Sequence, residues 1–127
     1  MKILNKRTGE VICFNVKIAN SFFSRFFGLM FTFSKKNLLL EFEKEGIFSS
    51  SIHMLFMFFS IDALWINSKM EIVDIQKNIK PFNPLNLSTW KIYKPKKPAK
   101  YVLELGVEKI EDKNIKEGDV VEFINSQ

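Results

Sequence analysis

Apolar and polar residues alternate over much of the chain, a period of two that is typical of β-strands with one buried face. The clearest run covers residues 10–19, where four apolar side chains share one face: Ile12, Phe14, Val16 and Ile18. We expect one half-buried strand over this run. It would pair in a hairpin with a strand over residues 2–5, across a turn at residues 6–9.

Further segments carry the β-branched, aromatic and leucine residues that are common in strands. They are residues 38–42, 52–54, 61–66, 71–76, 101–105 and 120–124. The segments 61–66 and 71–76 flank a short polar stretch, which predicts a second hairpin. The pattern predicts about seven strands in all.

One segment has helical spacing instead. Four apolar residues between positions 22 and 30 fall on one helical stripe: Phe22, Phe26, Leu29 and Met30. Asn20 or Ser21 offers an N-cap, and Gly28 would weaken or end the helix. Residues 107–113 are a second candidate for a turn of helix. The chain is therefore predicted to be α+β, a compact β-rich domain of about seven strands with one or two short helices.

The length of 127 residues predicts one domain over residues 1–127, since either half alone would be marginal in size. Apolar residues make up 46% and charged residues 26%, which is an ordinary globular composition. All four prolines lie in residues 81–98, and we expect a long basic surface loop there.

The chain has a single cysteine, Cys13, and a formal net charge of +5. Its first residues are charged and form no secretory signal, so we expect a cytoplasmic protein without disulfides. The longest apolar stretch runs from Met54 to Phe59. A membrane-spanning helix needs about 20 apolar residues, so no membrane span is expected.

Four short motifs occur in order along the chain: Arg-Phe-Phe-Gly-Leu-Met at 25–30, His53-Met54 followed by Ile61-Asp62, Tyr-Val-Leu-Glu-Leu at 101–105, and Gly118-Asp119. In this order they resemble the small prokaryotic family catalogued as domain of unknown function 192, over roughly residues 15–124. The resemblance implies a compact β-rich fold and no established activity. Many members have Trp-Met-Lys-Asn-Thr where this chain has residues 53–57, so a ligand role of the Lys-Asn-Thr trio is not carried over.

Four residues are candidates for ligand binding: Arg25, His53, Asp62 and Glu104. Arg25 lies among phenylalanines, and its permanent charge requires a partner. We expect that partner to be the carboxylate of Asp62 or Glu104, or backbone carbonyls. The alternatives are a purely structural ion pair, a backbone-bonded His53 and solvent-exposed acids. Arg7 falls in the predicted hairpin turn, where its identity is expected to matter little, and Asp119 is expected to be a turn residue.

Two surfaces are candidates for partners. The lysine-rich loop offers a polyanion contact with interleaved aromatic residues: Lys91, Tyr93, Lys94, Lys96, Lys97 and Lys100. The apolar run offers a surface for a protein partner or for self-association: Leu55, Phe56, Met57, Phe58 and Phe59. The alternatives are a solvated loop and an ordinary core segment, respectively.

The sequence shows no pattern that would hold a metal ion or a cofactor, and no nucleophile–base pair for catalysis. His53 is the only histidine, and Cys13 lies forty residues away from it. We therefore expect a small cytoplasmic binding or interaction module rather than an enzyme, acting through an apolar surface or a shallow pocket. The alternative is binding of nucleic acid or another polyanion through the lysine-rich loop.

Overall fold

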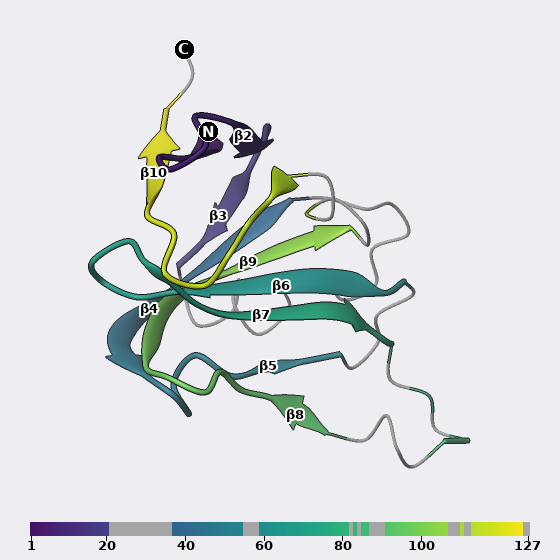
Figure 1. The fold of residues 1–127 in the computed structure, drawn as a ribbon. Helices are drawn as coiled ribbons and strands as arrows, with labels where there is room; N and C mark the ends of the chain where they lie inside the picture. Colours follow the sequence, from purple (N-terminus) through teal and green to yellow (C-terminus); the bar gives the residue numbers. More distant parts are fainter. Residues whose placement is uncertain are drawn as a thin grey trace.

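The computed structural model describes residues 1–20, 37–54, 59–81, 83, 85–86, 91–106, 110 and 113–125 (Figure 1). These residues contain ten strands. They are β1 (Lys2–Asn5), β2 (Val11–Cys13), β3 (Lys17–Ala19), β4 (Leu38–Gly46), β5 (Ile52–His53), β6 (Ile61–Ile66), β7 (Ile72–Ile79), β8 (Ile92–Tyr93), β9 (Ala99–Gly106) and β10 (Val121–Ile124).

The predicted α+β class is wrong, because the described part of the chain is built of strands and contains no α-helix. The helix expected at residues 22–30 lies outside the described residues, as do most of residues 107–113. Strands are also longer and more numerous than the pattern indicated: β4 continues to Gly46, and β8 lies within the proline-containing segment. Pairing with a neighbouring strand satisfies backbone groups whatever the side chains are, so strands extend past the alternating run.

Strand β9 lies at the centre of a five-stranded sheet with the order β3-β4-β9-β6-β7 (Figure 1). It pairs antiparallel with β4 on one side and with β6 on the other. A three-stranded sheet, β10-β1-β2, and a two-stranded ribbon of β5 and β8 complete the fold. The edges of the large sheet are β3, which runs parallel to β4, and β7.

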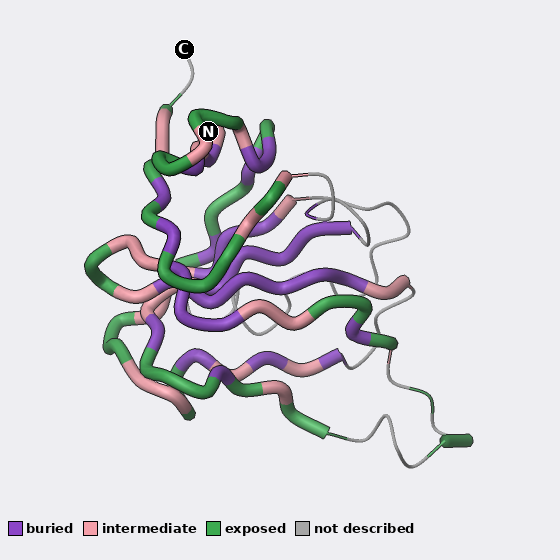
Figure 2. The backbone as a smooth tube through the Cα atoms, in the orientation of Figure 1, coloured by how far each residue is buried: buried purple, intermediate pink, exposed green. Residues whose placement is uncertain are grey.

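Each face of the five-stranded sheet has its own apolar core. Leu39, Leu64 and Leu103 pack with residues of the three-stranded sheet in one cluster, called here the second cluster. On the other face, Trp65 and Val102 pack with Ile52 of the ribbon and the adjacent Met54 in another cluster, called here the first cluster. Figure 2 shows the resulting burial of the central strands, whereas the second half of β7 is largely exposed or half-buried.

The run at residues 10–19 forms two strands instead of the single strand that its alternation predicts. Strand β2 pairs antiparallel with β1, which confirms the hairpin, but β3 pairs in parallel with β4. Between them Asn15 adopts a φ of 53°, a left-handed conformation that breaks the alternation. Phe14 is consequently 57% exposed, although Ile12 and Val16 are buried. The second predicted hairpin is confirmed by the antiparallel pairing of β6 and β7.

Trp65, in β6, packs in the first cluster and is hydrogen-bonded to the segment before β5. Its side chain is fully buried, and its indole Nε1–H donates a hydrogen bond of 2.8 Å to the carbonyl oxygen of Ser50. Ser50 is itself buried, so the carbonyl has little access to water. This one side chain therefore contributes both packing and a buried hydrogen bond.

Trp65→Phe should destabilise the protein by about 1–3 kcal/mol, because the buried Ser50 carbonyl loses its donor. Urea unfolding followed by circular dichroism measures the change. Phe42→Leu is the control, since Phe42 is a half-buried aromatic residue packed on the same cluster. An equal or smaller loss for Trp65→Phe than for the control would show that the indole hydrogen bond adds nothing to stability.

Candidate functional site

The structure separates two of the predicted ligand-binding acids. Asp62 lies opposite Leu105 in the β6–β9 pairing, whereas Glu104 lies opposite the neighbouring residue, Ala63. Because successive residues of a strand point to opposite faces, the two carboxyl groups lie on different faces of the sheet. One arginine therefore cannot approach both acids from one side. Arg25 itself lies outside the described residues.

Asp62 has a structural role at an irregularity in the sheet. It is buried, and its Oδ1 accepts a hydrogen bond of 2.8 Å from the backbone N–H of Asn78. The register between β6 and β7 shifts here, and Asn78 adopts a φ of 53°. The carboxylate thus satisfies a backbone donor that the irregular ladder would otherwise leave without a strand partner.

Glu104 is buried among apolar neighbours. It lies opposite Leu38 on β4 and Ala63 on β6, and only 5% of its surface is exposed. The solvent-exposed alternative for this residue is therefore wrong. Burial raises the pKa of the Glu104 carboxyl to about 8. The group therefore keeps its proton near neutral pH and adds no charge to the core.

Two further predictions concern His53 and the apolar run at residues 55–59, and they have different outcomes. His53 is half-buried on β5, opposite Ile92 of β8. Of the apolar run, residues 55–58 lie outside the described residues, and Phe59 is partly buried against the first cluster. The partner surface that this run predicts thus stays a prediction. Within the described ranges, no three histidine, cysteine or acidic side chains gather into a group that could hold a metal ion.

The lysines of the proline-containing segment are not equivalent. The Nζ of Lys96 forms ion pairs with Glu117 and, at 3.9 Å, with Asp74. The backbone N–H of Lys96 also donates to Oδ2 of Asp74 at 3.1 Å. Lys100 lines a cleft of about 270 Å³ that also contains Glu41 and Glu43. These two lysines therefore lie near acids of the same chain.

Lys91 and Tyr93 instead line a groove of about 350 Å³ between β7 and β8, which we call the basic groove. Its other described lining residues come from β7 and its end: Gln76, Lys77, Asn78, Ile79 and Lys80. The side-chain amide of Gln76 donates to the carbonyl oxygen of Lys94 at 3.1 Å, which joins the two walls. No aspartate or glutamate is among these described lining residues.

Sequence reasoning identified Lys91 and Tyr93 but missed Lys77 and Lys80. The two missed lysines belong to a different segment, and only the packing of β8 beside β7 brings them to the same groove. Polar residues at the end of β7 were a weak signal, since exposed ends of edge strands are often lysine-rich in any protein.

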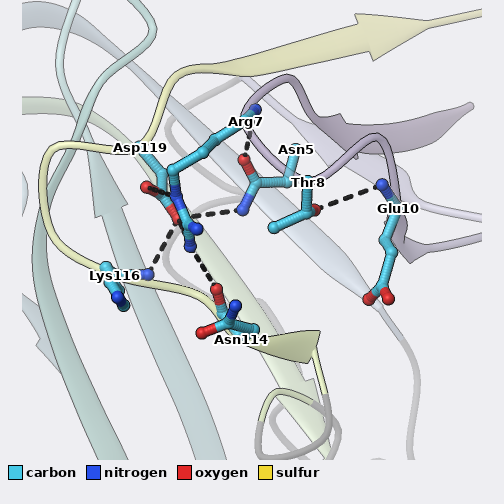
Figure 3. A network of polar contacts seen from close by, with 7 residues as sticks. All are labelled: Asn5, Arg7, Thr8, Glu10, Asn114, Lys116 and Asp119. Carbon is cyan, nitrogen blue, oxygen red and sulfur yellow. Dashed lines mark hydrogen bonds and ion pairs between the residues drawn. The ribbon is translucent and has the colours of Figure 1, made fainter.

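Arg7 forms a network that the sequence did not predict (Figure 3). Its Nε lies 2.6 Å from Oδ1 of Asp119, and its Nη2 donates to Oδ2 of the same carboxylate at 3.0 Å. Asn5 and the backbone N–H of Lys116 each donate to Asp119 at 2.9 Å. The Arg7 hydrogen bond, together with those from Lys116 and Asn5, lowers the pKa of Asp119 to about 2. The identity of Arg7 therefore matters, because it joins the β1–β2 turn to the turn before β10.

Comparison with protein families identifies relatives over nearly the whole chain. The sequence profile of the family DUF192, described as "Uncharacterized ACR", matches residues 3–123. A UPF0127 protein of Thermococcus sibiricus is 39% identical over 123 residues, which cover 95% of this chain and 73% of that protein. A UPF0127 protein of Pyrococcus furiosus is 36% identical over 121 residues, covering 95% of this chain and 97% of that protein.

Two solved structures have the same fold. One, from Sinorhizobium meliloti, is described as a candidate transcription regulator; its TM-score is 0.79 at 22% identity, over 95% of this chain and 89% of that one. The other is a protein of unknown function from Novosphingobium aromaticivorans, with a TM-score of 0.78 at 18% identity, over 96% and 82% of the two chains. No helix in the described part of this chain is long and apolar enough to cross a membrane.

Glu104→Gln should remove a pH dependence of stability. The pKa of Glu104 is about 8 in the folded state against an ordinary value of 4.5, so the folded state retains a proton that the unfolded state releases. Stability of the parent protein should therefore fall between these pH values, by up to about 1.4 kcal/mol per pH unit, relative to the glutamine variant. Urea unfolding at several pH values from about 5 to 9 measures the difference.

Glu122→Gln is the matched control, because Glu122 is an exposed residue of β10. The Glu104 and Glu122 variants should behave alike at the acidic end of the range and differ at the alkaline end. Parallel stability curves for the parent and the Glu104 variant would show that Glu104 ionises as an ordinary exposed acid does.

Arg7→Met should lower the melting temperature at neutral pH, and the difference from the parent should shrink as the pH falls. The pKa of Asp119 is lowered to about 2, so its ionised form stabilises the fold above its ordinary pKa of 3.8. That contribution is lost as the pH falls toward 2, when Asp119 takes up a proton. Thermal melts at several pH values measure this, with Lys6→Met, at an exposed neighbour, as the control. Equal melting temperatures for both variants at neutral pH would contradict a specific role of Arg7.

Proposed function

The chain belongs to the DUF192 family, which is described only as uncharacterised, and we propose that it is a small binding module that holds a polyanion in the basic groove. This proposal unites two expectations from the sequence, a shallow pocket and a lysine-rich polyanion contact. It assigns binding, and no chemical step, to the protein.

The observation that supports this proposal is the composition of the groove walls. Lys77, Lys80 and Lys91 line a space of about 350 Å³, with no acid among the described lining residues. Like charges that share a groove repel one another, and the potential of such a groove attracts anions and raises their local concentration. Asn78 and Tyr93 add polar groups that can donate hydrogen bonds to anionic oxygens.

The rest of the basic segment supports the same assignment by contrast. Lys96 is held by Asp74 and Glu117, and hydrogen bonding to Glu117 raises the pKa of its ammonium group. An ammonium paired in this way is less able to bind an external phosphate, since it would first have to leave its carboxylates. The proposed contact is therefore smaller than the loop that the sequence suggested, and it is shared with β7.

Lysine suits phosphate groups in particular. Its ammonium acts as a compact point charge with rotatable donors, whereas the fork of arginine matches a carboxylate with two parallel hydrogen bonds. The described groove walls contain lysine and no arginine. A phosphate-bearing polymer is thus the class of polyanion that the walls fit best.

Replacing Lys77, Lys80 and Lys91 by alanine should weaken binding of a fluorescein-labelled oligonucleotide at least tenfold, measured by fluorescence anisotropy at low salt. Each phosphate contact adds about 0.7 to the slope of log affinity against log salt for a single strand, so the triple variant should lose a slope of about 2. Inorganic polyphosphate, added as a competitor, should displace the oligonucleotide from the parent protein.

The control is a second triple variant with the same loss of charge at exposed lysines elsewhere: Lys6→Ala, Lys17→Ala and Lys69→Ala. It should retain the affinity and the salt slope of the parent, apart from a small effect of net charge. Equal weakening in the two triple variants, or no binding by the parent at low salt, would refute the basic groove as the binding site.

A further inference from the structure

Phe48 is an exposed aromatic side chain on a well-defined turn. It lies between β4 and β5 and is 77% exposed. Its carbonyl oxygen accepts hydrogen bonds from the backbone N–H and the hydroxyl of Ser51, at 3.2 and 2.7 Å. The neighbouring Ser50 hydroxyl donates to Gly46 at 2.6 Å, and the Ser50 carbonyl is held by Trp65. The backbone that carries the exposed ring is therefore hydrogen-bonded on both sides.

The Phe48 ring is connected to the basic groove through Lys94. The Nζ of Lys94 lies 4.8 Å from the centre of the Phe48 ring, and its backbone carbonyl accepts the hydrogen bond from Gln76 in the groove wall. A second pair of the same kind lies within the groove, where the Nζ of Lys91 is 5.0 Å from the centre of the Tyr93 ring. Each of the two aromatic rings thus has an ammonium group beside it.

These lysines follow one extended segment. Lys91 and Lys94 flank β8, and three residues of extended chain span about 10 Å along the backbone. Nucleotides of a strand repeat every 3.4 Å or so when they are stacked, so two or three of them would cover this distance. Ile92, between these lysines, is also exposed and adds apolar surface.

From this arrangement we infer that the polyanion is a single-stranded nucleic acid, whose phosphates contact the groove lysines and whose base stacks on the exposed ring of Phe48. The inference rests on the proposed function and specifies its ligand. Proteins that bind single strands without sequence preference combine a basic groove with aromatic stacking surfaces, because every base has a π-face. A duplex keeps its bases stacked inside, and polyphosphate has none, so neither would use an exposed phenyl ring.

An acidic peptide is the competing class of ligand, since it would also contact lysines and an apolar ring. The described groove walls lack arginine, the side chain whose planar fork best matches a peptide carboxylate. A ring with an ammonium group beside it suits a nucleotide, because the base can stack on the ring while the ammonium group contacts the neighbouring phosphate. We therefore assign the surface to nucleic acid and use an acidic polymer as an arm of the test.

The test compares binding of a fluorescein-labelled oligothymidylate of about 12 nucleotides to the full chain and to its Phe48→Ala variant; this length falls within known site sizes for single-strand binding. Fluorescence anisotropy gives the affinity, and unlabelled polyphosphate, the matching duplex and polyglutamate serve as competitors. Phe48→Ala should weaken oligothymidylate binding about tenfold. The inhibition constant of polyphosphate should be the same for this variant as for the parent, because polyphosphate has no base to stack on the ring. Phe48→Trp should retain the parent affinity or increase it.

Phe14→Ala is the matched control, because Phe14 is also an exposed phenylalanine and lies beside β2. It should bind oligothymidylate as the parent does, and circular dichroism should show that both alanine variants are folded. If Phe48→Ala binds like the parent while the groove-lysine triple variant does not, stacking on Phe48 is refuted and the proposed function stands. If polyglutamate or the duplex competes better than oligothymidylate at equal charge, the ligand class is refuted. If the parent binds neither oligothymidylate nor polyphosphate at low salt, the proposed function fails as well.

Discussion

Strand β9 is hydrogen-bonded along both edges, to β4 and to β6, and the placement of the other elements depends on this double pairing. A strand in this position has a packed core on each face, so Val102 joins the first cluster and Leu103 the second. From Val102 to Gly106 the strand has no solvent-facing side for a polar residue. Glu104 is therefore buried, and its carboxyl, with a pKa raised to about 8, remains neutral near pH 7.

An unpaired charge would be costly inside the sheet, so the charged side chains lie at its periphery. They are arranged there in two ways. Some pair within the chain: Asp119 holds Arg7 between two turns, and Lys96 lies between Asp74 and Glu117. Others line the basic groove at the free edge of β7, where the described walls contain no acid. The first kind of arrangement links segments of the fold, and the second gathers positive charge where we propose that an external anion binds.

Sequence patterns predicted local structure well in the two hairpins, β1–β2 and β6–β7. They failed at residues 10–19, because alternation records which residues are apolar and not which neighbouring strand each part of the run will join. There the left-handed Asn15 lets β2 pair with β1 and β3 pair with β4, so Phe14 becomes exposed. The predicted class also failed, since long-range pairing extended the strands and the described part of the chain is all β.

The sequence by itself determined the family, through four short motifs in order, and the positions of most strands. Both depend on residue types and their local spacing. Only the tertiary structure decided that Asp62 and Glu104 face opposite ways, since a one-residue difference in register reverses the side of the sheet. It also decided that Lys96 pairs with two acids and that Lys91 lies in a groove. Lys96 and Lys91 are five residues apart in the same basic segment, and they differ because one meets acids from distant strands and turns while the other meets lysines at the end of β7.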